Sequence, residues 1–192
     1  MDVKDKKIGF VLTGSFCTFS KTIPKIKELV KMGAEVIPIM SYNAYNLDTK
    51  FGKAEDFIKE IEEITGKKII HTIQESEPIG PKHLTDIMVV APCSGNTMSK
   101  LANDIIDTPA TMAVKSHLRN NLPVVIAAST NNALSGNASS IAALLNRKNY
   151  YFVPFRQDNP ITKPRSVVFD FDYLIKTVES ALDEKQIQPI LL

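Results

Sequence analysis

Four short apolar runs, each stopping abruptly at small polar residues, constrain the fold of this chain more than any other feature. They lie at residues 7–12, 35–40, 86–91 and 123–128, and a weaker run follows at 150–153. Short runs rich in β-branched residues are typical of strands buried on both faces. Between them, apolar residues recur at helical spacing, as in residues 19–32. This alternation predicts one doubly wound, Rossmann-like α/β domain over residues 1–192, with a parallel sheet and helices on both faces.

Bulk properties exclude several other classes of protein. The net charge is only +2, with Lys and Arg scattered along the chain, so nucleic acid is not expected as a partner. No apolar run approaches the roughly 18 residues of a membrane span, and the charged residues 1–7 do not resemble a signal peptide. We therefore expect a cytoplasmic protein without membrane contact. Cys17 and Cys93 lack the spacing of metal ligands, so no metal site is expected.

Two segments fall outside the regular alternation. The Pro-rich residues 154–166 are predicted as a mobile loop beyond the last strand, and residues 184–192 as a C-terminal tail. His117 is expected near the C-terminus of a helix, where the helix dipole favours a cationic imidazole. Neither His117 nor His83 is placed to form a catalytic triad, so no catalytic residue is assigned.

The polar residues that end the strands indicate where a ligand binds. They form four groups, at residues 13–16, 41–43, 92–97 and 129–132. In doubly wound sheets, ligands bind beyond the carboxyl ends of the strands. A strand followed by Gly14-Ser15 and a helix presents free amides and the positive end of a helix dipole, which favour a phosphate. Helix capping is the alternative role of any one of these short polar residues.

The loop at residues 92–97 repeats this arrangement after the central strand. Gly95 permits a close approach to a ligand, while Ser94, Asn96 and Thr97 either cap the following helix or donate to phosphate. The chain lacks the GxGxxG and GxxxxGK(S/T) motifs that hold pyrophosphates and triphosphates, so a monophosphate is favoured. We expect the two loops to lie on adjacent strands and to share one phosphate.

Residues 92–97 and 100–107 resemble two motifs of the flavin-containing cysteine decarboxylase superfamily. Those motifs are P-x-S-x-N-T and K-(L/I)-A-N-G-(I/L)-(A/T)-D. The resemblance implies a flavoprotein-type fold in which the two loops bind the phosphate and ribityl chain of flavin mononucleotide (FMN), with Ser41 near the flavin. It also implies a homo-oligomer, a trimer or larger. The residues then expected to bind the cofactor are Gly14, Ser15, Phe16, Ser41, Pro92, Cys93, Ser94, Gly95, Asn96 and Thr97.

Further segments resemble the branch of this superfamily that takes part in dipicolinate synthesis. They are residues 77–81, 108–115, 117–120, 151–155, 157–158 and 186–190. The resemblance implies oxidation of dihydrodipicolinate to dipicolinate during endospore formation. It also implies a separate A subunit that resembles a nicotinamide-dependent dehydrogenase, with NAD(P) on that partner rather than on this chain.

The chain departs from the decarboxylase pattern at two places. Pro78 stands where those enzymes carry an active-site His, and of their Pro-Ala-Met-Asn motif only Asn132 is retained. A positioned acid or base typically supplies about 10²- to 10⁴-fold in rate, so cysteine decarboxylation is not expected. Two alternatives stay open: a non-catalytic assembly subunit with a vestigial flavin or phosphate pocket, and a flavin-dependent decarboxylase with a relocated acid or base.

Basic residues of the segment 154–166 suit a dicarboxylate substrate. Arginine contacts carboxylates through two parallel hydrogen bonds. We hypothesise that Arg156 or Arg165 holds a substrate carboxylate or contacts the A subunit, and that Asn132 also lies near the substrate. The alternative is that these charges, with Lys163, belong to an ordinary solvated loop.

Overall fold

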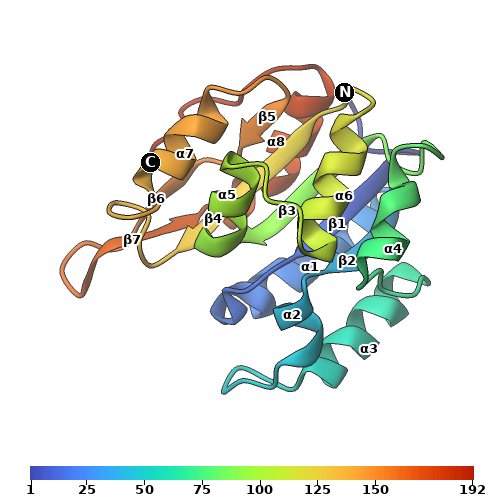
Figure 1. The fold of residues 1–192 in the computed structure, drawn as a ribbon, viewed down its shortest axis with the longest axis horizontal. Helices are drawn as coiled ribbons and strands as arrows, with labels where there is room; N and C mark the ends of the chain where they lie inside the picture. Colours follow the sequence, from blue (N-terminus) through green and yellow to red (C-terminus); the bar gives the residue numbers. More distant parts are fainter.

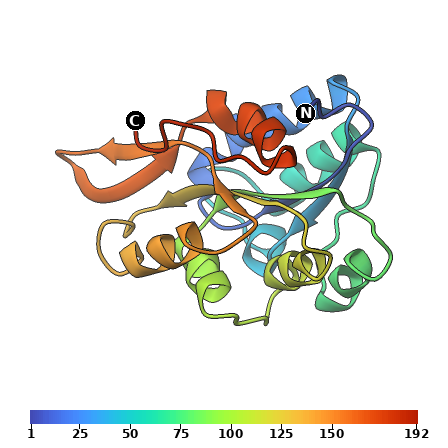
Figure 2. The ribbon, with the colours of Figure 1, turned by 90° about the horizontal axis from the view of Figure 1, so that it is seen from above.

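The computed structural model describes residues 1–192 and has three layers, with a central sheet between two layers of helices (Figures 1 and 2). The strands are β1 (Lys7–Leu12), β2 (Glu35–Met40), β3 (Ile87–Cys93), β4 (Val124–Thr130), β5 (Tyr150–Phe152), β6 (Phe155–Asn159) and β7 (Lys163–Phe169). The α-helices are α1 (Phe19–Lys31), α2 (Tyr42–Asn46), α3 (Ala54–Thr65), α4 (Ile73–Ser76), α5 (Gly95–Ala102), α6 (Pro109–Leu118), α7 (Ala138–Leu145) and α8 (Leu174–Leu182). Short 3-10 helices lie at Phe16–Thr18, Glu77–Ile79 and Phe171–Tyr173.

The sheet is mixed and has seven strands in the order β2-β1-β3-β4-β7-β6, with β5 also paired to β4. Strands β1 to β5 are parallel, as the apolar runs predict. Strand β4 has two partners along the same edge: its first half pairs with β5, and Ser129 and Thr130 at its end pair antiparallel with β7. Figure 2 shows α1 and α8 on one side of the sheet and α4, α5, α6 and α7 on the other.

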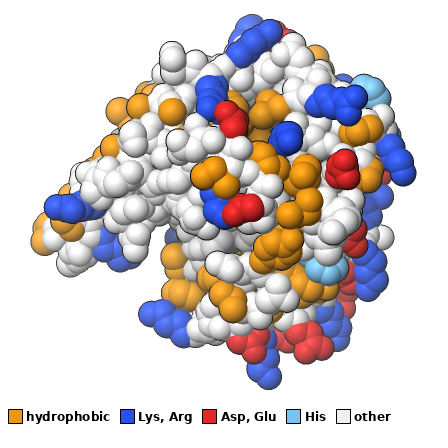
Figure 3. Space-filling model, in the orientation of Figure 1, with side chains coloured by type: hydrophobic (Ala, Val, Ile, Leu, Met, Phe, Trp, Pro, Cys, Tyr) orange, Lys and Arg blue, Asp and Glu red, His pale blue; other side chains and the backbone are white.

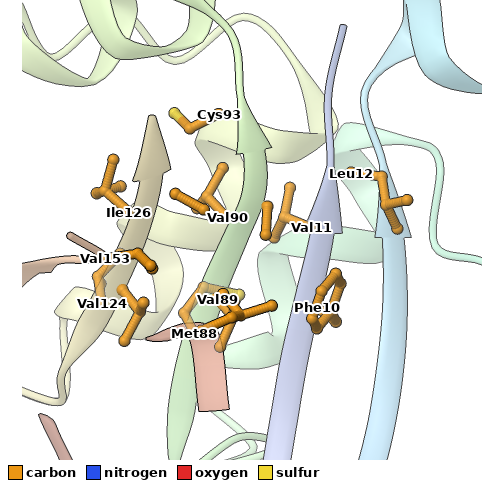
Figure 4. Packing of buried hydrophobic residues seen from close by; sticks show 14 of the residues in the cluster. Phe10, Val11, Leu12, Met88, Val89, Val90, Cys93, Val124, Ile126 and Val153 are labelled. Atoms are coloured by element: carbon orange, nitrogen blue, oxygen red, sulfur yellow. The ribbon is translucent and has the colours of Figure 1, made fainter. Parts of the chain in front are cut away.

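The core lies between the parallel strands and the helices, in one cluster of 46 buried residues. All seven residues of β3 are buried, because helices cover this strand on both faces. Figure 4 shows side chains of β1, β3 and β4 packed side by side, among them Phe10, Val90 and Ile126. No helix combines the length and the apolar character needed to cross a membrane.

The prediction of a loop at residues 154–166 is wrong. Residues 155–169 form the β6–β7 hairpin, which projects from the body of the molecule (Figure 1). Its strands carry polar residues exposed to solvent, so the apolar periodicity that marks the other strands is missing. The tail 184–192 runs beside this hairpin, where the Phe155 amide donates to the Ile190 carbonyl at 3.0 Å.

Candidate flavin-binding site

The loops that follow β1 and β3 are joined by the side chain of Thr13. Its hydroxyl donates to the Pro92 carbonyl at 2.7 Å and accepts a hydrogen bond from the Ser94 amide at 2.9 Å. Thr13 is fully buried, so both bonds are shielded from water. Gly14 lies directly against the second loop, since a Cβ atom added there would be 3.6 Å from Cβ of Ser94. The two Gly-Ser loops therefore lie next to each other at the carboxyl edge of the sheet.

The end of β4 is held against the first loop, and the residue that precedes α7 is held against the second. Ser15, in the left-handed conformation at φ 74°, donates its hydroxyl hydrogen to the Ser129 carbonyl at 2.6 Å. On the other side, Asn137 donates to the Gly95 carbonyl at 3.1 Å and to the Ser99 hydroxyl at 2.6 Å. The Asn137 side chain leaves no space for a Cβ atom at Gly95. Position 95 is thus restricted to glycine by a neighbour that comes from a distant part of the sequence.

A cavity of about 890 Å³ opens beside these loops. Its wall is built by the loop after β1, the start of α1, the start of α5, the end of β4, the β6–β7 hairpin and the 3-10 helix at Phe171–Tyr173. Figure 3 shows the surface receding beneath the projecting hairpin, which carries Lys and Arg side chains. The cavity therefore lies at the carboxyl edge of the sheet, where ligands of doubly wound proteins bind.

Six of the predicted site residues line the cavity. They are Ser15, Ser94, Gly95, Asn96, Asn132 and Arg156. Gly95 and Asn96 begin helix α5, and the amides of the first helical residues have no partner within the helix. Ser94 caps this helix, because its hydroxyl accepts from the Thr97 amide at 3.4 Å. The two free amides can donate hydrogen bonds to a phosphate, and the positive end of the helix adds to the attraction. The lack of a Cβ atom at position 95 lets the ligand approach the backbone.

The other predicted residues lie outside the cavity wall. Phe16 packs on Phe19 with ring centroids 5.2 Å apart, and Ser41 caps α2 by accepting from the Ala44 amide at 3.3 Å. The Thr97 hydroxyl is hydrogen-bonded to the Ser94 hydroxyl at 3.1 Å, which stabilises the cap of α5. Gly14 lies against the side chain of Ser94, and the Pro92 carbonyl accepts the hydrogen bond from Thr13. The Arg165 side chain is exposed and does not line the cavity.

Cys93 is buried at the end of β3, beyond Val90 (Figure 4). Burial away from water strongly raises the pKa of its thiol, because the thiolate would lose its hydration. The thiol therefore stays protonated, and Cys93 contributes to packing rather than to a contact with a ligand.

Sequence reasoning missed several residues of the cavity wall. Lys21 reaches it from α1, and Phe171 from the 3-10 helix before α8, while Asn137 supports it from behind. The site was predicted from polar residues that follow the strands, and neither Lys21 nor Phe171 lies at the end of a strand. Asn137 does lie close in sequence to Asn132, but only the fold shows that it bonds to α5.

Two of the three cations in the cavity wall are paired with carboxylates. Arg156 donates to Asp170 at 2.8 Å, and the Asp170 side chain is only 13% exposed. Lys163 donates to Asp158 at 2.6 Å. Lys21 has no carboxylate within 4.0 Å. Asp170 already binds part of the Arg156 guanidinium, so only the remaining N–H groups are free for a substrate carboxylate.

The expectation of a cationic His117 is wrong. His117 lies in the last turn of α6, and its ring is fully buried, with the Thr85 hydroxyl at 2.8 Å and the Pro123 carbonyl at 2.9 Å. Burial lowers the pKa of His117 to about 4, because the charged imidazole would lose its hydration. His117 is therefore neutral near pH 7 and has a structural role.

These loops and this fold define a class of protein. The sequence model of the flavoprotein family matches residues 1–166, and the chain belongs to that family. Within it, the chain is 48% identical to the B subunit of dipicolinate synthase from Bacillus subtilis (strain 168), over 99% of this chain and 95% of that protein.

Solved structures agree with this assignment. The crystal structure of the B subunit of dipicolinate synthase from Bacillus halodurans C superimposes with a TM-score of 0.91 at 44% identity, covering 100% of this chain and 98% of that one. The FMN-dependent cysteine decarboxylase SpaF shares the fold, with a TM-score of 0.71 at 19% identity over 95% of this chain and 98% of the other.

Proposed function

We propose that this chain is the FMN-binding B subunit of a dipicolinate synthase. It acts with a dehydrogenase-like A subunit, which carries NAD(P), to oxidise dihydrodipicolinate to dipicolinate in the mother-cell cytoplasm of a sporulating bacterium. The reaction removes two electrons and two protons from the ring, which becomes aromatic. When bound, FMN would supply a two-electron acceptor for such an oxidation, and oxidised NAD(P) on the A subunit would be the final acceptor of the two electrons.

The hydrogen bonds of Thr13 carry this proposal. They hold the loops after β1 and β3 together beside a single cavity, as a shared phosphate site requires. The amides of Gly95 and Asn96 would hold the phosphate, with the α5 dipole adding to their attraction. The identity of 48% over nearly the whole chain to a dipicolinate synthase B subunit supports the reaction. The FMN-dependent relative with the same fold supports the choice of flavin.

The chain's own residues would bind and orient the substrate. Asn132 and Arg156 lie in the same cavity as the phosphate loops, so both can contact a ligand beside the flavin. Asn132 accepts a hydrogen bond from the Thr130 hydroxyl at 2.6 Å, which leaves its amide NH₂ group free to donate to a carboxylate. A homo-oligomer, a trimer or larger, is part of the proposal, and the cubic cage formed by a protein of the same fold, DmrB of Burkholderia xenovorans, supports it.

The proposal is tested by the absorption spectrum of the freshly purified protein, alone and with the A subunit. Bands between about 350 and 500 nm that belong to protein-bound FMN are expected. A colourless protein that also fails to bind added FMN would exclude the cofactor and with it the redox role.

A second function, assembly without catalysis, is favoured by Pro78 at the position of the decarboxylase His. Reconstitution separates it from the first. Dipicolinate formation is measured with the A subunit alone, with the wild-type chain, and with Ser94→Ala/Thr97→Ala. The matched control is Thr108→Ala/Thr111→Ala, which removes the same kind of cap from α6, away from the cavity. Loss of activity in the first double variant alone supports the flavin pocket, and full activity in both supports the assembly role.

A further inference from the structure

One positive charge in the wall of the cavity has no partner within the protein. Lys21 lies in the first turn of α1, and its side chain is exposed on the cavity surface. The other two cations of this wall, Arg156 and Lys163, are each hydrogen-bonded to an aspartate. An exposed lysine without a partner is ordinary elsewhere on the surface. Here, however, Asp170 and Asp158 pair with the other two cations, so Lys21 leaves the wall with a net positive charge, which favours an anionic ligand.

The Lys21 ammonium has a defined position. It lies 5.4 Å from the centroid of the Phe171 ring, within the range of a cation–π contact. Phe171 is itself held by Phe169, with ring centroids 4.4 Å apart, and both rings line the cavity. The contact with the ring uses one side of the ammonium, so N–H donors are left for a ligand.

Lys21 stands in a different part of the wall from the phosphate-binding amides. Those amides belong to the start of α5, whereas Lys21 belongs to α1 and lies against the segment that follows the β6–β7 hairpin. The same part of the wall contains Arg156, from β6. The wall of the cavity thus presents neutral backbone amides at the start of α5. It presents cationic side chains and aromatic rings where α1, β6 and the 3-10 helix at Phe171–Tyr173 meet.

We infer that Lys21 binds a carboxylate of the dicarboxylate substrate and of its planar product, in a subsite completed by Phe171. A compact ammonium binds a carboxylate as a point charge, and the ring beside it suits a flat heterocycle. Arg156 in the same wall is placed for the second carboxylate, through the part of its guanidinium that Asp170 does not use. This inference rests on the proposed function, since it takes its ligand from that reaction.

The test compares two ligands that differ by one carboxylate. Dipicolinate and picolinate are titrated by calorimetry into the FMN-loaded complex of this chain with the A subunit. The wild-type complex is expected to bind dipicolinate about tenfold more tightly than picolinate. In Lys21→Met this preference is expected to disappear, whereas Lys21→Arg retains most of it.

The chain offers a matched control on the same helix. Lys27 is also exposed, has no carboxylate partner and does not line the cavity. Lys27→Met changes the net charge by the same amount, so it is expected to keep the wild-type preference. A Lys21→Met complex that discriminates between the ligands as Lys27→Met does would overturn the inference.

Flavin absorbance separates failure of the inference from failure of the proposed function. Lys21→Met is expected to retain FMN as tightly as the wild type. A loss of FMN affinity in this variant would place Lys21 at the cofactor and overturn the substrate role. A wild-type protein without FMN that still shows the Lys21-dependent preference would instead contradict the flavin proposal and leave the carboxylate subsite supported.

Discussion

The Thr13 hydroxyl and the Ser94 amide, 2.9 Å apart, connect two loops that are 81 residues apart in sequence. Because the same hydroxyl donates to the Pro92 carbonyl, one buried side chain satisfies two backbone groups of the second loop. The position of the α5 N-terminus therefore depends on a residue of the loop after β1.

Thr13→Val should destabilise the protein and weaken flavin binding. The substitution keeps the side-chain volume but leaves the Ser94 amide and Pro92 carbonyl without partners, at a cost of about 2 kcal/mol. Urea unfolding measures the first effect, and titration with FMN the second. The control is Thr177→Val, on α8, which loses only a bond to the Tyr173 carbonyl. It should bind FMN normally, and equal FMN affinity in both variants would contradict the role assigned to Thr13.

Gly95→Ala should lower stability by about 1–3 kcal/mol, because its Cβ would overlap the Asn137 side chain and lie 2.5 Å from the Thr130 hydroxyl. Gly136→Ala is the control, since its Cβ would meet only the Asn132 amide nitrogen at 3.7 Å. Thermal unfolding of the two variants compares these costs directly. Similar melting temperatures would mean that the side chains around Gly95 move aside for a Cβ atom at little cost in stability.

Arg156 and Arg165 should differ in their effect on the reaction. Arg156→Ala removes a cation from the cavity wall and leaves Asp170 unpaired, so repulsion of a dicarboxylate is added to the lost attraction. We expect KM for dihydrodipicolinate to rise about tenfold in the reconstituted enzyme. Arg165→Ala should stay within about twofold of wild type, because that side chain lies outside the cavity. The reverse order would point to a contact between Arg165 and the A subunit.

Stability should fall in mild acid because of His117. Its folded-state pKa of about 4 lies below the ordinary value of 6.5, so between these values the unfolded chain binds a proton that the folded protein does not. The stabilisation is complete above about pH 6.5 and is lost as pH falls toward about 4. Between pH 7.5 and 4.5 this group should account for a loss of about 2 to 3 kcal/mol in unfolding free energy.

Urea unfolding of His117→Phe at both pH values checks this assignment. The variant should be less stable at pH 7.5, since Thr85 and Pro123 lose a partner, but its further loss at pH 4.5 should be smaller than that of wild type. His83→Asn, at an exposed position, should keep the full wild-type loss. An unchanged pH dependence in His117→Phe would show that other groups cause it.

The parallel part of the fold was predictable from sequence, whereas the antiparallel edge was not. Strands such as β3 are buried on both faces, so their residues are continuously apolar and stand out in the sequence. The β6–β7 hairpin has exposed polar residues and is formed by backbone pairing with the end of β4. Backbone hydrogen bonds leave no pattern in side-chain type, and Pro160 and Pro164 suggested a loop.

The amino-acid sequence by itself determined the order of the parallel strands and the loops that carry Ser15, Ser94 and Gly95, because these depend on local periodicity and on turn residues. Only the tertiary structure decided which polar residues meet in the cavity. It brought Lys21 and Arg156 into the wall, left Arg165 outside it, and set Asn137 behind Gly95. Such choices depend on distances between segments far apart in the chain, which packing of the whole sheet and its helices defines.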